Sequence, residues 1–138
     1  MAEEVLHECL ISVGSNIEPW THIEQAREIL SRECRLIAAS SIIETAPVGF
    51  QDQPNFLNAA FWVETRLDRH AFKNYLRQVE DRLGRERGKI KSGPRTIDLD
   101  IVLWNRQVVD DDYYLYDYVR RPADELLTTL GLSIDEAT

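Results

Sequence analysis

The sequence predicts an α+β domain with the ferredoxin-like, split-βαβ arrangement, in which two helices cover one face of an antiparallel sheet. Three observations predict it. Short apolar or alternating segments indicate four strands, two longer segments carry apolar residues at helical spacing, and the order is strand, helix, strand, strand, helix, strand. We expect residues 1–138 to form a single domain, because a chain of this length can bury a core of its own.

The first strand and the first helix are predicted within the first 34 residues. Residues 8–14 are short and mostly apolar, and Gly14 ends them, which is typical of a buried strand. Pro19 then precedes a capping-box pattern, in which Thr21 and Glu24 would satisfy free backbone N–H groups. The helix extends to about residue 34 through an apolar stripe at Ile23, Ala26, Ile29 and Leu30.

Two strands and a second helix follow. Residues 35–44 are rich in Leu, Ile, Ala and Ser without helical spacing, so they favour a strand. Residues 56–66 alternate, which places Leu57, Ala59, Phe61 and Val63 on one face and Asn58, Ala60, Trp62 and Glu64 on the other. Asp68 can cap a second helix that ends at Gly84. Its apolar stripe runs through Phe72, Tyr75, Leu76, Val79 and Leu83.

The remaining segments are a long loop, a hairpin and a tail. Residues 84–94 contain three glycines, and we expect this loop to be mobile until a nucleotide binds. A strand at 96–104 then turns into a short return strand at 108–109. The acidic, aromatic residues 110–118 are interpreted as a solvated turn and edge strand, because tyrosine favours strands and consecutive aspartates rarely pack. A short helix can follow Pro122 within residues 120–130.

Composition disfavours several classes of protein. A net charge of −8 argues against a nucleic-acid binder. No apolar run approaches the roughly 18–20 residues of a membrane span. The acidic start lacks the features of a secretory signal, so we expect a cytoplasmic protein. We also expect it to be a monomer or a weak dimer. Cys9 and Cys34 lack metal-ligand spacing and are expected to be free thiols. The three histidines are scattered, so a zinc site is not expected.

Residues 93–101, Gly-Pro-Arg-Thr-Ile-Asp-Leu-Asp-Ile, carry the strongest functional signal. On a strand, Asp98 and Asp100 share one face, while Ile97, Leu99 and Ile101 point the other way. Two neighbouring carboxylates repel one another unless they are hydrated or neutralised by a cation. Hard oxygen ligands in small number suit Mg²⁺, which takes the rest of its shell from water and substrate phosphates.

The charge pattern around this motif favours a functional interpretation over a solvated strand face. Residues 82–95 hold six of the 16 Lys and Arg residues and one acid, on a protein that is otherwise strongly acidic. Such a local positive region attracts anions. Cations beside a metal-binding carboxylate pair are typical of phosphoryl transfer, although a pair of alternate aspartates taken alone is most often a hydrated surface.

Three motifs resemble those of the 6-hydroxymethyl-7,8-dihydropterin pyrophosphokinase family of folate biosynthesis. They are Gly14-Ser-Asn at the end of the first strand, residues 44–58 from Glu-Thr-Ala-Pro-Val-Gly-Phe to Asn-Phe-Leu-Asn, and residues 93–101. The resemblance covers roughly residues 10–109. It implies transfer of pyrophosphate from ATP to the hydroxymethyl oxygen of the dihydropterin, with release of AMP and with two Mg²⁺ ions.

The resemblance also implies roles for individual residues. Asp98 and Asp100 would hold both metal ions against the ATP phosphates. Arg85 and Arg87 would lie on the loop that closes over the nucleotide, and Arg95 would meet phosphate from the rigid side. The remaining positions on the nucleotide side are Glu80, Lys91 and Ile101. The pterin pocket would be formed by Thr45, Pro47, Val48, Phe56 and Asn58, in which Phe56 stacks on the ring and Asn58 meets its amide edge.

The sequence departs from the family at three places. Ser92 stands where the family usually has a Trp that stacks on the pterin, and Lys91 stands where it usually has Arg. Asp117-Tyr118 stands at the offset of a Pro-His pair. A diverged paralogue that binds or modifies another pterin therefore remains the alternative to an active pyrophosphokinase. A ferredoxin-like RNA-binding module is a weaker alternative, because its surface should be basic.

Overall fold

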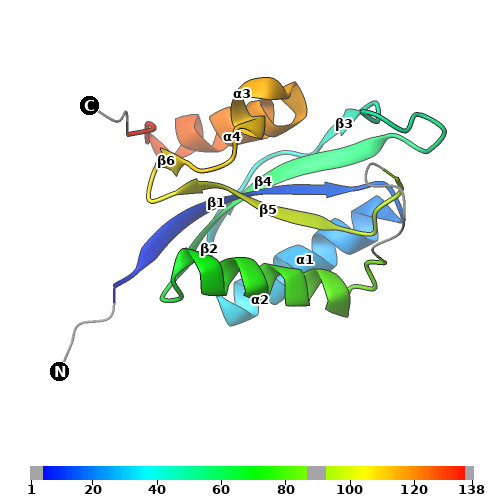
Figure 1. Ribbon diagram of the computed structural model, residues 1–138. Helices are drawn as coiled ribbons and strands as arrows, with labels where there is room; N and C mark the ends of the chain where they lie inside the picture. The colour runs from blue at the N-terminus through cyan, green and yellow to red at the C-terminus, as the bar shows by residue number, and fades with distance from the viewer. Residues whose placement is uncertain (1–4, 87–92, 136–138) are drawn as a thin grey trace.

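The computed structural model describes residues 5–86 and 93–135, and its middle layer is a six-stranded sheet (Figure 1). The strand order is β2-β4-β1-β5-β6, β3 pairs with β4, and every pairing is antiparallel. The strands are β1 (His7–Ser15), β2 (Arg35–Ala39), β3 (Ile43–Thr45), β4 (Phe56–Thr65), β5 (Asp98–Trp104) and β6 (Gln107–Val108). The helices are α1 (Pro19–Glu33), α2 (Arg69–Arg82), α3 (Asp112–Leu115) and α4 (Asp117–Leu130). The predicted α+β, split-βαβ fold is confirmed.

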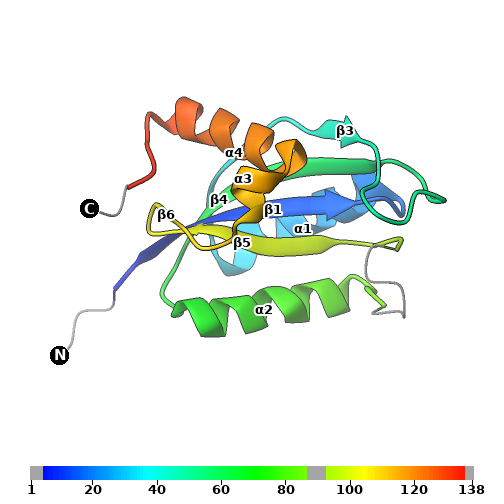
Figure 2. The same cartoon turned by 45° about the horizontal axis from the view of Figure 1, so that its top comes forward.

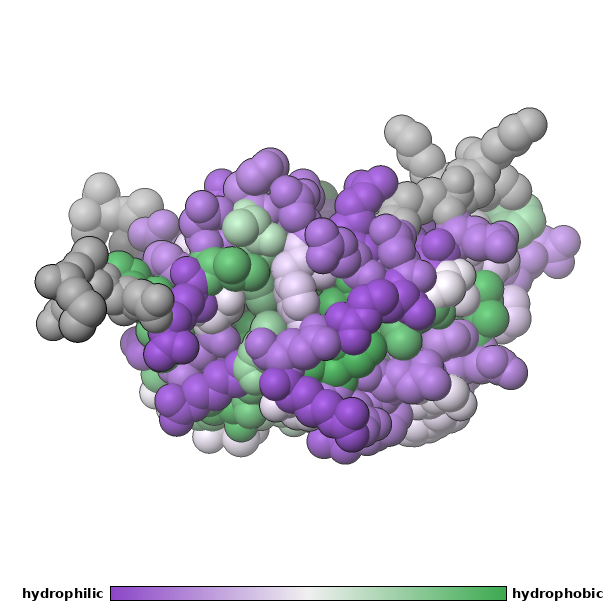
Figure 3. Space-filling view, turned by 90° about the horizontal axis from the view of Figure 1, so that it is seen from below, coloured by the Kyte–Doolittle hydropathy of each residue, from purple (hydrophilic) through white to green (hydrophobic). Residues whose placement is uncertain are grey.

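Helices α1 and α2 cover one face of the sheet, as predicted (Figure 1). The core on this side combines the apolar stripes of the two helices with alternate residues of the strands, among them Ile11, Val13, Phe61 and Leu99. The outer surface of this helical layer is mostly hydrophilic (Figure 3). The strand faces predicted from alternation are therefore correct, because Ile97 and Leu99 enter this core while Asp98 and Asp100 face the other way.

Helices α3 and α4 lie on the opposite face of the sheet and add a layer that the sequence did not predict (Figure 2). Their apolar residues form a second core against Leu10, Trp62 and Leu103. The interpretation of residues 110–118 as a solvated turn and edge strand is wrong, because Tyr113 is buried in α3 and donates its phenolic hydrogen bond to Asp124 at 2.5 Å.

Two helix boundaries also differ from the predictions. Helix α1 begins at Pro19 after Glu18, whose φ of 40° is left-handed, so Thr21 lies inside the first turn and the predicted capping box does not form. Helix α4 begins before Pro122 and continues through it. Burial of an apolar stripe at Val119, Ala123, Leu126 and Leu127 offsets the backbone hydrogen bond that proline cannot make.

The segment predicted as one strand at 35–44 is divided into β2 and β3. Ser40 lies between them and bonds twice to β4: its backbone N–H donates to the Ala60 carbonyl at 2.9 Å, and its hydroxyl accepts from the Ala60 N–H at 2.8 Å. At the break between β2 and β3, the Ser40 hydroxyl therefore takes the place of a backbone acceptor in the hydrogen bonding to β4. The second helix, by contrast, begins as predicted, with Asp68 Oδ1 accepting from the Ala71 N–H at 2.8 Å.

Two further predictions concern cysteine chemistry and membranes. Cys9 and Cys34 are free thiols, the first buried and the second half-buried, as expected. Within residues 5–86 and 93–135, none of the helices combines the length and the apolar character needed to cross a bilayer.

Candidate functional site

The predicted site residues gather where β1, β4 and β5 lie side by side, on the face of the sheet that α3 and α4 partly cover. Gly14 of β1 pairs with Asn58 on one side and with Asp98 on the other. A Cβ atom at Gly14 would lie 3.1 Å from Asn58 Oδ1, tighter than ordinary contacts. Glycine at this position therefore leaves room for the amide in the floor of the site.

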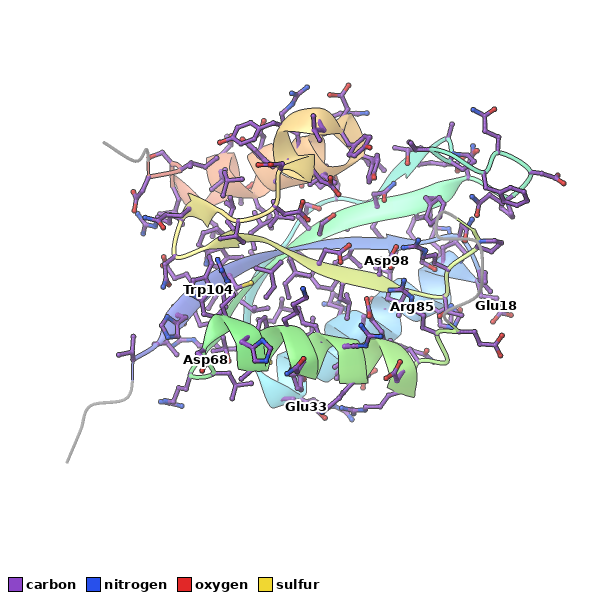
Figure 4. The ribbon with its side chains drawn as sticks, in the orientation of Figure 1. Glu18, Glu33, Asp68, Arg85, Asp98 and Trp104 are labelled. Atoms are coloured by element: carbon purple, nitrogen blue, oxygen red, sulfur yellow. The ribbon has the colours of Figure 1, made fainter. Side chains whose placement is uncertain are left out.

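Asp98 pairs with two arginines, Arg85 and Arg95. Figure 4 shows the first of them, Arg85, beside Asp98. Arg85 Nη1 is 2.5 Å from Oδ1, and Arg95 Nη1 is 2.9 Å from Oδ2. The Asp98 side chain is 18% exposed, so it is not part of a hydrated strand face. These two ion pairs place a predicted metal ligand, Asp98, in direct contact with two predicted phosphate-binding residues.

Glu80, at the end of α2, fixes Arg85 from the other side. Its Oε2 accepts from Arg85 Nη1 at 3.0 Å and from the Leu99 backbone N–H at 2.8 Å, and the residue is buried. Arg85 Nε is buried without a hydrogen-bond partner in the part of the chain that the structure describes. One guanidinium therefore bridges two carboxylates, and its Nε remains an unbonded donor among the described residues.

Asp100 differs from Asp98 in its electrostatics. The protein atoms around it displace part of its hydration shell, and the nearby charges of Asp98, Glu80 and Asp110 add repulsion, so the pKa of Asp100 rises to about 7. Its carboxylate remains accessible to solvent through the cavity beside it. The site thus has more negative charge near Asp100 than its arginines neutralise.

A small cavity of about 180 Å³ contains most of the predicted pterin positions. Thr45, Val48, Phe56 and Asn58 line it, together with Gly14, Arg95, Asp98 and Asp100. Asn58 Nδ2 donates to Thr45 Oγ1 at 2.5 Å, which fixes the orientation of the amide. Pro47 is half-buried and does not line this cavity.

A larger cleft of about 800 Å³ lies between α2 and the β5–β6 hairpin. The predicted nucleotide positions Glu80, Arg85 and Ile101 line it. Three cations of α2, spaced four residues apart, also line it: Arg69, Lys73 and Arg77. Within the described ranges no ion pair or hydrogen bond engages these three side chains. Sequence reasoning missed them, because cations on the outer face of a helix resemble ordinary hydrated charge.

Asn16 is a second residue to which the sequence reasoning gave no role. It is buried and makes four hydrogen bonds: two with the Arg95 backbone, at 2.8 and 3.1 Å, one to Gln53 at 2.8 Å and one to the Pro54 carbonyl at 3.1 Å. One side chain thus joins the loop before β4 to the segment that carries Arg95. A buried amide with every group bonded is a strong local constraint.

Three sequence predictions fall outside the described residues. Arg87, Lys91 and Ser92 lie within residues 87–92, as does most of the loop expected to be mobile. Their assignments stay predictions.

Comparison with known proteins identifies the family. The family model for 7,8-dihydro-6-hydroxymethylpterin-pyrophosphokinase matches residues 10–128. The chain belongs to this family. A 2-amino-4-hydroxy-6-hydroxymethyldihydropteridine pyrophosphokinase of Bacillus subtilis (strain 168) is 38% identical over 113 residues, which cover 80% of this chain and 67% of that protein. A pyrophosphokinase of the same name from Pseudomonas aeruginosa is 37% identical over 103 residues, covering 72% and 63% of the two chains.

Relatives with two activities in one chain also match this pyrophosphokinase-family protein. A mitochondrial folate synthesis bifunctional protein of Arabidopsis thaliana is 35% identical over 139 residues, which cover 96% of this chain and 25% of that protein. The chain therefore spans about two thirds of the Bacillus protein and about a quarter of the Arabidopsis protein. The membership predicted from the three motifs is confirmed.

Proposed function

We propose that this chain transfers pyrophosphate from ATP to 6-hydroxymethyl-7,8-dihydropterin in folate biosynthesis, with Mg²⁺ and with release of AMP. One observation supports this most directly. Asp100 lines both the small cavity and the large cleft, so a carboxylate stands at the boundary between two compartments of different chemistry. A reaction that joins a flat ring compound to a polyphosphate needs that kind of boundary.

The small cavity suits the pterin. Phe56 offers an aromatic face to a flat heteroaromatic ring, and Asn58 and Thr45 offer amide and hydroxyl groups to its polar edge. Asp98 and Asp100 lie at the same cavity, so the hydroxymethyl group of a ring bound in this way would point toward the carboxylates.

The large cleft suits the nucleotide. Its α2 wall carries Arg69, Lys73 and Arg77, and Arg85 also lines it. Guanidinium groups remain charged and bind phosphate oxygens in two directions, which suits the triphosphate of ATP.

The residues also fit Mg²⁺. Asp98 and Asp100 supply hard oxygen ligands, and the uncompensated repulsion around Asp100 is relieved by a divalent cation. Within residues 5–86 and 93–135 no group of three potential ligands is placed to hold a metal alone, so water and phosphate oxygens would complete the shell. Bound Mg²⁺ neutralises charge on the transferring phosphates.

The reaction then follows from positioning. The hydroxymethyl oxygen forms a bond with the β-phosphorus, the bond from that phosphorus to the oxygen bridging the α- and β-phosphates breaks, AMP leaves, and the hydroxyl proton passes to water. Arg85 and Arg95 hold phosphate oxygens in place, while Phe56 and Asn58 orient the ring. No residue needs to form a covalent bond.

A diverged paralogue that binds a pterin without transfer is the second candidate. It is supported by the two arginines that already neutralise Asp98, because a metal must compete with them. It is also supported by Asp117 and Tyr118 in place of the family's Pro-His pair.

A binding and turnover experiment separates these candidates. Isothermal titration with a non-hydrolysable ATP analogue and Mg²⁺, with and without 6-hydroxymethylpterin, should give mutual enhancement of affinity if one assembled site binds both. AMP release with the dihydropterin substrate should then exceed the rate without it. Synergy without AMP release would select the non-transferring paralogue, and the absence of pterin binding would exclude both candidates.

A further inference from the structure

The floor of the small cavity carries a hydroxyl group, that of Ser12. This residue lies in the middle of β1, is half-buried and lines the cavity of about 180 Å³. Among residues 5–86 and 93–135, no hydrogen bond engages its side chain. Alanine would pack equally well at a position that needs only a small side chain, so the hydroxyl is left for whatever occupies the cavity.

The face of β1 that carries Ser12 becomes less bulky toward the site. Alternation places Leu10, Ser12 and Gly14 on this face: Leu10 packs in the second core, whereas the other two line the cavity. Larger side chains at these two positions would fill the space, because protein interiors pack closely. Ser12 therefore lies where the apolar core gives way to the polar floor of the site.

Ser12 is paired directly with Asp100 where β1 runs antiparallel to β5. Both residues line the small cavity, so both side chains point to the same side of the sheet. Directly opposite residues of this kind have Cβ atoms about 4.5–5.5 Å apart. Within the part of the chain that the structure describes, the Asp100 carboxylate accepts no hydrogen bond either. A hydroxyl and a carboxylate thus stand side by side, and each can bond to a ligand.

The amide that suits the ring lies one step further along β1. Gly14 pairs with Asn58 on β4, whereas Ser12, two residues earlier, pairs with Asp100 on β5. Two residues of a strand span about 6.6 Å. The amide edge of a pterin and its 6-substituent lie at opposite ends of the fused rings. A pterin that meets Asn58 with its amide edge would therefore bring the substituent, and not the ring, close to Ser12.

We propose that Ser12 is a specificity-determining residue for the hydroxyl group of the ring substituent: its Oγ accepts a hydrogen bond from that hydroxyl, and its own hydrogen is directed at the Asp100 carboxylate. A serine hydroxyl donates one bond and accepts others, so one side chain can make both. Because the substrate hydroxyl donates this bond, the lone pairs of its oxygen stay available to the β-phosphorus. The inference rests on the proposed function, since it takes a hydroxymethylpterin as the occupant of the cavity.

Binding measurements with two ligands test the inference. 6-Hydroxymethylpterin and 6-methylpterin differ only in the hydroxyl group, and the change in pterin fluorescence reports their binding. Mg²⁺ and a non-hydrolysable ATP analogue are present throughout. Ser12→Ala keeps the space and removes the hydroxyl, so we expect the Kd of 6-hydroxymethylpterin to rise about two- to tenfold and that of 6-methylpterin not to rise.

Two further variants complete the experiment. Ser31→Ala is the matched control, because Ser31 is exposed on α1 and does not line the cavity, so both Kd values should stay unchanged. Ser12→Val replaces the hydroxyl by methyl groups that fill part of the floor, so the Kd of both ligands should rise. Thermal unfolding shows whether each variant keeps its fold. If Ser12→Val fails to fold, Ser12→Ala still tests the contact, since it removes no hydrogen bond among the described residues.

The outcomes are distinguishable. If the parent binds 6-hydroxymethylpterin and Ser12→Ala binds it with the same Kd, the assignment of Ser12 is overturned while the proposed function stands. Equal losses for both ligands in Ser12→Ala would also overturn it, because the lost contact would then not be to the hydroxyl. A folded Ser12→Val that binds both ligands like the parent would show that the substituent lies elsewhere. If the parent binds neither pterin, the proposed function fails and this inference fails with it.

Discussion

The backbone N–H of Leu99 donates a hydrogen bond to the carboxylate of Glu80 across 2.8 Å and thereby joins β5 to the end of α2. The same carboxylate oxygen accepts from Arg85, which in turn contacts Asp98. The position of the arginine is thus tied to the position of the strand that carries both aspartates. The stability of this corner and the geometry of the site depend on one buried acid.

We expect Glu80→Leu to lower the free energy of unfolding by about 3 kcal/mol or more, because it leaves the Leu99 N–H without a buried partner and removes one of the two carboxylates that Arg85 contacts. Glu80→Gln should cost less, since its carbonyl oxygen can still accept one hydrogen bond. Urea unfolding monitored by circular dichroism measures both. Glu28→Gln, which removes an exposed ion pair on α1, is the control and should cost less than about 1 kcal/mol. Equal losses in all three variants would contradict the role of Glu80.

We expect Asp98→Asn and Asp100→Asn each to abolish Mg²⁺-dependent binding of the nucleotide and any AMP release, because each removes an anionic ligand that phosphates cannot replace. Both side chains face the cavity and not the core, so the variants should remain folded. Titration calorimetry with and without EDTA measures the metal-dependent part. Glu24→Gln, on the outer face of α1, should bind like the parent. Parental activity of either aspartate variant at limiting Mg²⁺ would show that the metal assignment is wrong.

The stability of the metal-free protein should fall as pH rises through the range in which Asp100 ionises. Its pKa is raised from 3.8 to about 7 in the folded state, so the folded state binds this proton more tightly than the unfolded state. The favourable contribution is complete below pH 3.8 and is lost by about pH 7. Asp100→Asn should therefore gain stability over the parent between these values and keep a constant advantage above them.

Thermal unfolding at a series of pH values with EDTA tests this dependence. Saturating Mg²⁺ should reduce the advantage of Asp100→Asn, because the parent then gains a cation that the variant cannot bind. A parent and variant that respond identically to pH would contradict the raised pKa.

The two thiols should differ in reactivity. Burial raises the pKa of Cys9 well above its usual range, and it also raises that of the half-buried Cys34, so neither thiol is an activated nucleophile. In the native protein we expect Cys34 to react slowly with DTNB and Cys9 to react only after unfolding. Peptide mapping after alkylation identifies the modified residue. Rapid modification of Cys9 in the folded protein would contradict the buried position.

The spacing of apolar residues correctly predicted the strands and helices in which apolar residues recur at a regular interval. The apolar stripe of α2 matches one face to one core, and the alternation of β4 divides its residues between the two cores. Asp68 caps its helix through a bond to a residue three positions away. Family motifs predicted which polar residues would gather around Gly14, because a long motif carries information that a lone Asp pair lacks.

The features that the sequence analysis predicted wrongly or did not predict depend on contacts between residues far apart in the chain. Tyr113 belongs to a helix because the second core buries it, and nothing in the run of aspartates before it indicates that core. Ser40 interrupts a strand because its hydroxyl meets the backbone of Ala60. The cations of α2 become part of a cleft only because the β5–β6 hairpin, which is distant in sequence, forms the opposite wall.

The central position of β1 has a consequence for how the protein folds. Residues 7–15 pair with β4 on one side and with β5 on the other, so its two neighbours come from residues 56–65 and 98–104. Non-local pairings of this kind close large loops before they gain contacts, which slows folding. During synthesis on a ribosome, the floor around Gly14 can therefore assemble only after β5 has emerged, and until then the edge of β1 that faces β5 stays unpaired even if β4 has already paired with the other edge.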